Sequence, residues 1–301
     1  MIKPRVSSHS GLEVTKMSAK LLYELHTCSV KTLLFRRWVT NARFSNNIHL
    51  NSKRNAHTTI EAKDYFQANK GIQWDPEGPL KPLYTLNYLR VPYIRDSLVN
   101  VAPGEKFSTC LKGKKILDVG CGGGFLSEAL AKLGAEVTGI DTNKEALEHT
   151  KKHSSNNMRL ANNLPAYIPV TIEEHCKEYA ESYDVVVSSE VIDHVAQKEL
   201  FVESCVRAAK PGAKLFFTTI NRTRLAQFVI IFCYENIVKT IPKGAHDFNM
   251  FIKPSELKYM LEMNDCFVES TKGYMFYPFD PHWVWTKHKM FFYAIEAVKS
   301  N

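Results

Sequence analysis

A glycine-rich loop between two apolar segments constrains the fold of this chain more than any other feature. The apolar segment at residues 116–119 precedes Gly120, Gly122 and Gly124, and a second apolar segment ends at Asp141. A buried strand, a glycine turn, a helix and a second strand that ends in an acid form a nucleotide-type β-α-β unit. Glycines let the backbone turn tightly and let a ligand approach it closely. We therefore expect an α/β fold with a ligand at this loop.

Two acids near the loop narrow the class of ligand. Asp118 lies where a dinucleotide fold brings its pyrophosphate, which a carboxylate would repel. Phe125 stands where the dinucleotide pattern requires its last glycine. Asp141 is placed to accept hydrogen bonds from both ribose hydroxyls. A cofactor without phosphate and with positive charge fits this loop, and S-adenosylmethionine has both properties. The predicted contacts are Asp118, Gly120, Gly122, Gly124 and Asp141.

The net charge of +8 is confined to the N-terminal leader. Residues 1–60 contain ten Lys and Arg against two acids, so the rest of the chain is neutral. A neutral body argues against a nucleic-acid partner. No acid occurs between Glu24 and Glu61, and arginines lie among apolar, Ser and Asn residues. This composition predicts a mitochondrial transit peptide over residues 1–50, with a disordered basic tail as the alternative.

Alternating apolar segments predict a single domain over residues 60–301. The predicted strands are 114–119, 135–140, 166–171, 183–189, 213–220, 266–274 and 290–298. The predicted helices are a short one from Glu61, 86–98 with an interruption near Pro92, 124–133, 143–153, 196–209, 225–238 and one that begins at Pro254. Alternation of this kind indicates a mostly parallel seven-stranded sheet with helices on both faces. Seven scattered cysteines without a C-x-x-C pair predict reduced thiols.

A second polar cluster follows the predicted strand 183–189. Glu190, Asp193 and His194 emerge at the carboxyl end of this strand, at the same sheet edge as the glycine loop. Their spacing of three and four residues places them on one face of a helical turn. Two carboxylates and an imidazole suit a divalent ion such as Mg²⁺, with Zn²⁺ or Mn²⁺ as alternatives. The competing interpretation is a polar helix start, in which the acids favour the helix dipole and the histidine is a cap.

From about residue 60 to 301 the chain resembles the ubiquinone-biosynthesis O-methyltransferases, mitochondrial and bacterial. The resemblance is carried by residues 86–96, 117–124, 189–195, 218–222 and Ile241-Pro242-Lys243-Gly244. It implies a Rossmann-like class I methyltransferase fold, S-adenosylmethionine and a divalent metal, with Mg²⁺ as the expected ion. It also implies methylation of a catechol-type hydroxyl on a polyprenylated dihydroxybenzoate or demethylubiquinol-type substrate.

The resemblance assigns roles residue by residue. It implies cofactor contacts from Arg90, the Gly120 loop, Asp141 and Ser189. It implies metal ligands at Glu190, Asp193 and His194. The family has Glu where this chain has Asp193, whose carboxylate is one methylene shorter. His194 is favoured as a ligand over a role as the base that takes the phenol proton. His246 is a weaker candidate for that base and is expected in an exposed loop.

An apolar helical insertion near residues 222–245 suggests where a prenyl tail is met. The segment Leu225–Tyr234 is either a buried helix or a surface helix that dips into a bilayer between flanking cations. With the leader and the resemblance, it predicts a peripheral protein on the matrix side of the mitochondrial inner membrane, within a multi-enzyme complex. The aromatic residues at 274–279 and 283–285 either line the ring pocket or pack against the sheet. Two alternative functions are a metal-independent small-molecule methyltransferase and a non-catalytic cofactor-binding scaffold.

Overall fold

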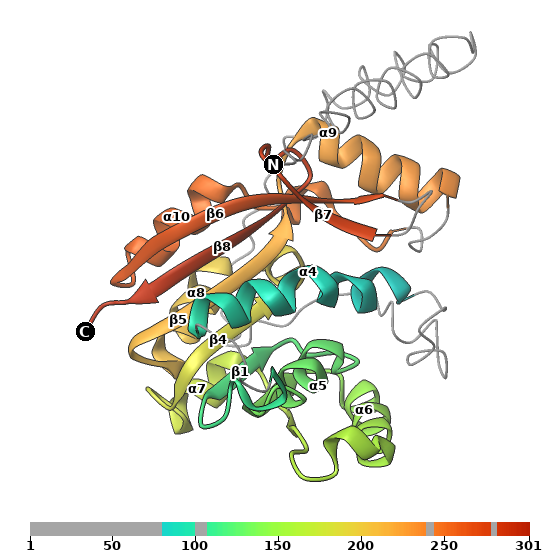
Figure 1. Cartoon of the computed structure of the whole chain (residues 1–301). Helices are drawn as coiled ribbons and strands as arrows, with labels where there is room; N and C mark the ends of the chain where they lie inside the picture. Colours follow the sequence, from blue (N-terminus) through green and yellow to red (C-terminus); the bar gives the residue numbers. More distant parts are fainter. Residues whose placement is uncertain (1–79, 100–106, 239–243, 278–281) are drawn as a thin grey trace, which may run out of the picture. The chain divides into compact units, whose positions relative to one another are not determined.

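A β-sheet forms the centre of the described chain, which in this computed structural model comprises residues 80–99, 107–238, 244–277 and 282–301 (Figure 1). The described residues belong to the compact unit Ala56–Asn301. The predicted leader over residues 1–50 and the short helix predicted from Glu61 lie outside the described residues. Residues 239–243 of the predicted insertion lie outside them as well.

The sheet contains eight strands within the described residues, in the order β3-β2-β1-β4-β5-β8-β6-β7. The strands are β1 (Lys115–Val119), β2 (Glu136–Asp141), β3 (Ala166–Pro169), β4 (Tyr183–Ser189), β5 (Ala209–Ile220), β6 (Cys266–Tyr277), β7 (His282–Thr286) and β8 (Phe292–Lys299). Strands β1 to β5 pair with one another in parallel. Strand β8 pairs antiparallel with β5 and with β6, and β7 pairs antiparallel with β6. The predicted α/β class is confirmed.

The helices alternate with the parallel strands. They are α4 (Lys81–Leu98), α5 (Phe125–Ala131), α6 (Lys144–Asn156), α7 (Ile172–Glu178), α8 (Lys198–Ala208), α9 (Arg224–Ala226) and α10 (Pro254–Glu262). A π-helical segment, η4 (Gln227–Val238), continues α9, and short 3₁₀ turns occur at η1 (Phe107–Thr109), η2 (Met158–Leu160), η3 (Ile192–His194) and η5 (Phe248–Met250). Side-chain caps begin several of these helices, as where the Asn143 side chain accepts the Ala146 amide at the start of α6.

Two apolar clusters cover the two faces of the sheet. Neighbouring residues of one strand point to opposite faces, so Ile116 and Leu117 of β1 belong to different clusters. One cluster joins the strands to α4, α5 and the start of the insertion, and the other joins them to α7, α8 and α10. Burial on both faces explains why the central parallel strands are continuous apolar segments.

Several sequence-based boundaries need correction. The sheet has eight strands and not seven, because the aromatic segment around Trp283 pairs with β6 as the edge strand β7. Helix α4 begins at Lys81 and continues through Pro92 without the predicted interruption. Helix α7 was not predicted, since its seven residues form barely two turns with little apolar periodicity. Residues 210–212, between the predicted helix 196–209 and the predicted strand 213–220, lie inside β5, where Gly212 adopts a φ of +72° at an irregular pairing.

The strand order places the site. It reverses direction at β1, which has β2 on one side and β4 on the other. Ligands of open α/β sheets bind outside the carboxyl ends of the strands at such a switch point. The loop after β1 and the polar residues after β4 therefore lie at one edge of the sheet, as the sequence predicts.

A buried carboxylate joins the two helices that flank the glycine loop. Glu128 of α5 accepts hydrogen bonds from the His153 ring and the Ser154 hydroxyl, both at 2.8 Å, and from the Asn157 amide at 3.0 Å. Burial opposes ionisation of Glu128, but these hydrogen bonds outweigh it and lower its pKa below 4.5. The ionised carboxylate therefore holds α6 against α5.

We expect Glu128→Gln to lower the free energy of unfolding by about 2 kcal/mol near neutral pH, because a carboxamide places a donor against these donors. Since the folded pKa is depressed, this stabilisation is present above pH 4.5 and is lost as the pH falls through the lowered value. Urea unfolding of both proteins at neutral and acidic pH measures the difference. Glu148→Gln on exposed α6 surface is the matched control. An equal difference at both pH values would show that the carboxylate charge contributes nothing.

Candidate active site

The glycine loop is held by backbone hydrogen bonds to β2. The amides of Gly120 and Cys121 donate to the Ile140 carbonyl at 2.8 and 3.0 Å. Gly120 has a φ of +73°, and a Cβ there would lie 2.5 Å from Val191 Cγ2. Glycine is required at this position because both the conformation and the space exclude a side chain. Gly122 and Gly124 also have positive φ values.

Asp141 ends β2 with both carboxylate oxygens directed at backbone amides. Oδ2 accepts the Gly122 amide at 2.8 Å, and Oδ1 accepts the Asn143 amide at 2.9 Å. Burial raises the pKa of Asp141, and these hydrogen bonds lower it. Each carboxylate oxygen has further lone pairs, so Asp141 can hold the loop and accept ribose hydroxyls together.

Asp118 is a buried carboxylate at the end of β1. The Ser127 hydroxyl donates to its Oδ2 at 2.6 Å. Burial raises the pKa of Asp118, whereas Ser127 and the positive charge of Arg90 lower it. Asp118 is therefore a buried acid at the carboxyl end of β1, beside the compensating charge of Arg90.

Arg90 begins a chain of hydrogen bonds that crosses the sheet edge. Its Nη1 donates to Ser189 Oγ at 2.7 Å, Ser189 and Thr218 hydroxyls lie 2.7 Å apart, and Thr218 donates to Glu190 Oε1 at 2.8 Å. Tyr274 also donates to Glu190 Oε1. Each hydroxyl carries one hydrogen, so every donor in the chain points toward Glu190. The structure thus connects Arg90 and Ser189, both predicted cofactor contacts, with Glu190.

Glu190 has an unusual backbone and a perturbed carboxyl group. Its φ of +58° lies in the left-handed region, which is uncommon outside glycine and occurs at functional sites. Its amide donates to the Thr218 carbonyl at 2.8 Å, which fixes the turn. Burial, and then the charge of Asp193, raise the pKa of Glu190 to about 7. Its carboxylate serves as the acceptor for Thr218 and Tyr274.

Asp193 and His194 lie on η3, and the structure adds His246 to them. One candidate ligand atom from each of these three residues lies within 4.8 Å of the others. Glu190 is not a member of this group. His246 is half-buried, with its side chain 13% exposed and its Nδ1 3.0 Å from Glu235 Oε1. The expectation that His246 lies in an exposed loop is therefore wrong.

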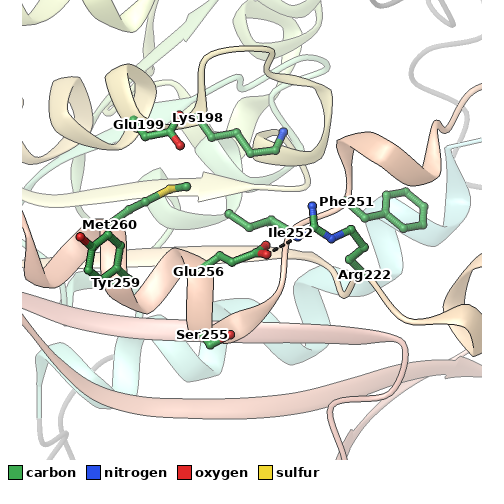
Figure 2. Close-up of a pocket in the computed structure, with 9 residues that line it drawn as sticks. All are labelled: Lys198, Glu199, Arg222, Phe251, Ile252, Ser255, Glu256, Tyr259 and Met260. Atoms are coloured by element: carbon green, nitrogen blue, oxygen red, sulfur yellow. Dashed lines mark hydrogen bonds and ion pairs between the residues drawn. The ribbon is translucent and has the colours of Figure 1, made fainter. Parts of the chain in front are cut away.

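A cavity of about 460 Å³ lies beside η3, on the side of α8 and α10. Figure 2 shows its lining residues, Lys198, Glu199, Arg222, Phe251, Ile252, Ser255, Glu256, Tyr259 and Met260. Lys198 Nζ donates to the carbonyls of Ile192 and Val195 at 2.7 and 2.6 Å, and Arg222 pairs with Glu256. The two Lys198 hydrogen bonds support the backbone of η3 and of Val195, which follows it. None of the predicted site residues lines this cavity.

Some residues of the site escaped prediction because their signals are weak in one sequence. Thr218 and Tyr274 come from β5 and β6, far along the chain from Glu190, and only strand pairing brings them together. Glu235 carries one detectable signal, since it is an acid near the end of a long apolar segment. A buried acid in such a segment requires partners.

Comparisons with known proteins identify the family of this chain. A family model described as "Methyltransferase domain" matches residues 117–217. The mitochondrial ubiquinone biosynthesis O-methyltransferase of Rattus norvegicus is 40% identical over 245 residues, covering 81% of this chain and 71% of the relative. The ubiquinone biosynthesis O-methyltransferase of Proteus mirabilis is 46% identical over 195 residues, covering 64% of this chain and 74% of the relative.

Among solved structures, a magnesium protoporphyrin IX methyltransferase from Synechocystis PCC 6803 with bound S-adenosylmethionine has a TM-score of 0.52. It is 17% identical, and the match covers 79% of this chain and 93% of that one. This likeness concerns the fold alone and confirms the Rossmann-like class I fold. Taken with the relatives, it leads to one conclusion: the chain belongs to the ubiquinone biosynthesis O-methyltransferase family and is an S-adenosylmethionine-dependent O-methyltransferase.

Proposed function

We propose that this methyltransferase of ubiquinone biosynthesis methylates a catechol-type hydroxyl of a polyprenylated dihydroxybenzoate or demethylubiquinol-type ring. The observation that carries the proposal is the shared sheet edge, where the loop with Asp118 and Asp141 meets η3 with Asp193 and His194. When bound there, S-adenosylmethionine supplies an electrophilic methyl group on its sulfonium. The residues of this chain orient the two reactants for an in-line displacement and exclude water.

We also propose a divalent metal on the substrate side of this edge, for which Mg²⁺ is the expectation from the family resemblance. The chemistry of Asp193 and His194 fits an ion, because a carboxylate and an imidazole with adjacent donor atoms are good ligands. A bound ion would lower the pKa of the catechol hydroxyl, which otherwise lies near ~10 as in a phenol. The imidazole then serves either as a ligand or as the base that accepts the phenol proton.

The cofactor site predicts the effect of Asp141→Ala. We expect S-adenosylmethionine to bind roughly 30- to 1,000-fold more weakly, since two charge-assisted hydrogen bonds are worth about 2–4 kcal/mol after desolvation. Isothermal titration calorimetry measures the affinity, and the thermal midpoint without ligand reports any loosening of the Gly122 loop. Asp96→Ala, at an exposed ion pair on α4, is the control. Unchanged affinity would remove Asp141 from the cofactor site.

The reaction itself is tested with a short-chain prenyl dihydroxybenzoate. We expect methyl transfer that a chelator abolishes and that a divalent ion restores, because the catechol hydroxyl is mostly protonated without the ion. Mass spectrometry detects the methylated ring. Full activity in chelator would favour the metal-independent methyltransferase. Binding of S-adenosylmethionine without any turnover would favour the non-catalytic scaffold.

The proposed location is mitochondrial, on the matrix side of the inner membrane and in contact with other enzymes of the pathway. The basic leader and the mitochondrial naming of the mammalian relatives support the organelle. No helix among the described residues is long and apolar enough to cross a membrane. Contact with the bilayer is instead proposed for the insertion formed by α9 and η4. Leu225 and Ile237 leave 43% and 58% of their surfaces exposed there.

We expect Leu225→Glu with Ile237→Glu to release the protein from anionic liposomes and to leave its thermal midpoint unchanged. Two exposed apolar contacts of up to ~1.5–3 kcal/mol each are lost, and two negative charges then face anionic lipid. Co-sedimentation with liposomes measures the binding. Met158→Glu with Phe267→Glu makes the same chemical change at exposed sites elsewhere and serves as the control. Retained binding by the insertion variant would assign the membrane contact to another surface.

A further inference from the structure

The arrangement around Asp193 leaves one carboxylate oxygen directed at histidine. Its side chain is 1% exposed, and Thr219 Oγ1 donates to Oδ1 at 2.8 Å. The other oxygen, Oδ2, lies 3.5 Å from His194 Nε2, which is beyond an ordinary hydrogen bond. A nearly buried carboxylate therefore has one oxygen fixed by Thr219 and one that faces an imidazole. A hydrogen bond from a neighbouring side chain, such as that of Thr219, orients carboxylates that bind metals.

His246 approaches the same point from the insertion. Its ring centre lies 5.7 Å from that of His194. Glu235 of η4 accepts three hydrogen bonds, from the Gly244 amide at 2.8 Å and from the His246 amide and Nδ1, both at 3.0 Å. With Nδ1–H donating to a carboxylate, the Nε2 lone pair is the one presented to an ion. Histidines that bind metals are commonly oriented by such a carboxylate.

Glu190 is occupied differently. Its carboxylate accepts from Thr218 and Tyr274, and it lies outside the group of candidate ligand atoms formed by Asp193, His194 and His246. To reach an ion at that group, Glu190 would give up hydrogen bonds in a buried environment, which costs free energy.

We infer that Asp193, His194 and His246 hold the ion, that Glu235 is the positioning residue for His246, and that two imidazoles and one carboxylate select a Zn²⁺-class ion over Mg²⁺. This inference rests on the metal in the proposed function and deepens it. Imidazole nitrogen suits zinc and neighbouring transition metals, whereas Mg²⁺ prefers oxygen ligands in an octahedron.

The geometry requires a small adjustment on metal binding. Ligand atoms at ~2.1 Å from a tetrahedral ion lie about 3.4 Å apart. Donor atoms that lie as far as 4.8 Å apart therefore approach one another by up to ~1.4 Å when an ion binds. Side-chain rotation provides this movement. Three protein ligands leave a coordination position open, which is the pattern of catalytic and not structural zinc sites. The half-exposed His194 places that open position toward solvent, where a catechol can enter.

The test uses the full chain, stripped with chelator and titrated calorimetrically with ZnCl₂, and separately with MgCl₂. We expect the wild type to bind one Zn²⁺ per chain at a saturable site whose affinity changes in the variants. We expect no Mg²⁺ binding of comparable affinity. His246→Ala should weaken that Zn²⁺ binding by roughly 100-fold or more, and Glu235→Gln by roughly 10- to 100-fold. His149→Ala removes an exposed imidazole on α6 and should change neither value. Thermal midpoints of the metal-free proteins report folding.

A second measurement needs no variant. The visible spectrum of the Co²⁺-loaded wild type should show the intense bands of a low-coordinate site with nitrogen ligands, not the weak bands of an octahedral oxygen site. The inference is overturned if Glu190→Gln abolishes the binding of one Zn²⁺ per chain while His246→Ala retains this binding. It is also overturned if Mg²⁺ binds more tightly than Zn²⁺. Both results preserve the metal of the proposed function. A wild type that transfers methyl groups and binds no ion would overturn that metal as well and leave the methyltransferase activity standing.

Discussion

The site depends on the buried positive charge of Arg90. Burial lowers the pKa of Arg90, and the charges of Asp118 and Glu190 raise it. A guanidinium removed from water costs several kcal/mol unless carboxylates and hydrogen-bond acceptors compensate. Asn87 Oδ1 and Ser189 Oγ each accept from it at 2.7 Å. Since Arg90 belongs to α4, this single charge fixes a helix that precedes the first strand against the ends of β1 and β4. The two acids in turn stay buried because the cation is there.

The residues beyond Arg90 form two groups, each restrained by its own contacts. Glu190 is restrained by its left-handed backbone, by Thr218 and by Tyr274. Asp193 and His194 follow on the short turn η3, which Lys198 supports through two backbone carbonyls. Rigid scaffolds with a short polar turn are well suited to catalysis, because reacting groups must be held within a fraction of an ångström. The polar network thus fixes Glu190, which lies two residues before η3.

Local sequence patterns located the parallel strands of the first half of the fold, although they missed α7 and broke α4 at Pro92. Strands β1, β2 and β4 are apolar segments that end in polar residues, so their positions followed from pattern, whereas their order in the sheet did not. The C-terminal half was less predictable. Strand β7 consists of alternating aromatic residues that pair with β6, and its strand character depends on that partner. Tyr274 and Glu235 joined the site through long-range contacts, which a periodicity argument cannot detect in one sequence.

The helix predicted at residues 225–238 is confirmed, and most of it is π-helical. A π-helix has more residues per turn than an α-helix, so the pattern expected at 3.6 residues per turn misplaces the faces of η4 (Gln227–Val238). In the structure Ile230 and Glu235 point inward, while Leu225 and Ile237 stay exposed. π-Helical turns occur frequently at functional sites. Here the inward acid holds His246 beside Asp193 and His194, and the outward apolar residues face away from the sheet. One segment therefore links the polar residues at the sheet edge to an exposed apolar surface, and this is the surface proposed above to contact the bilayer.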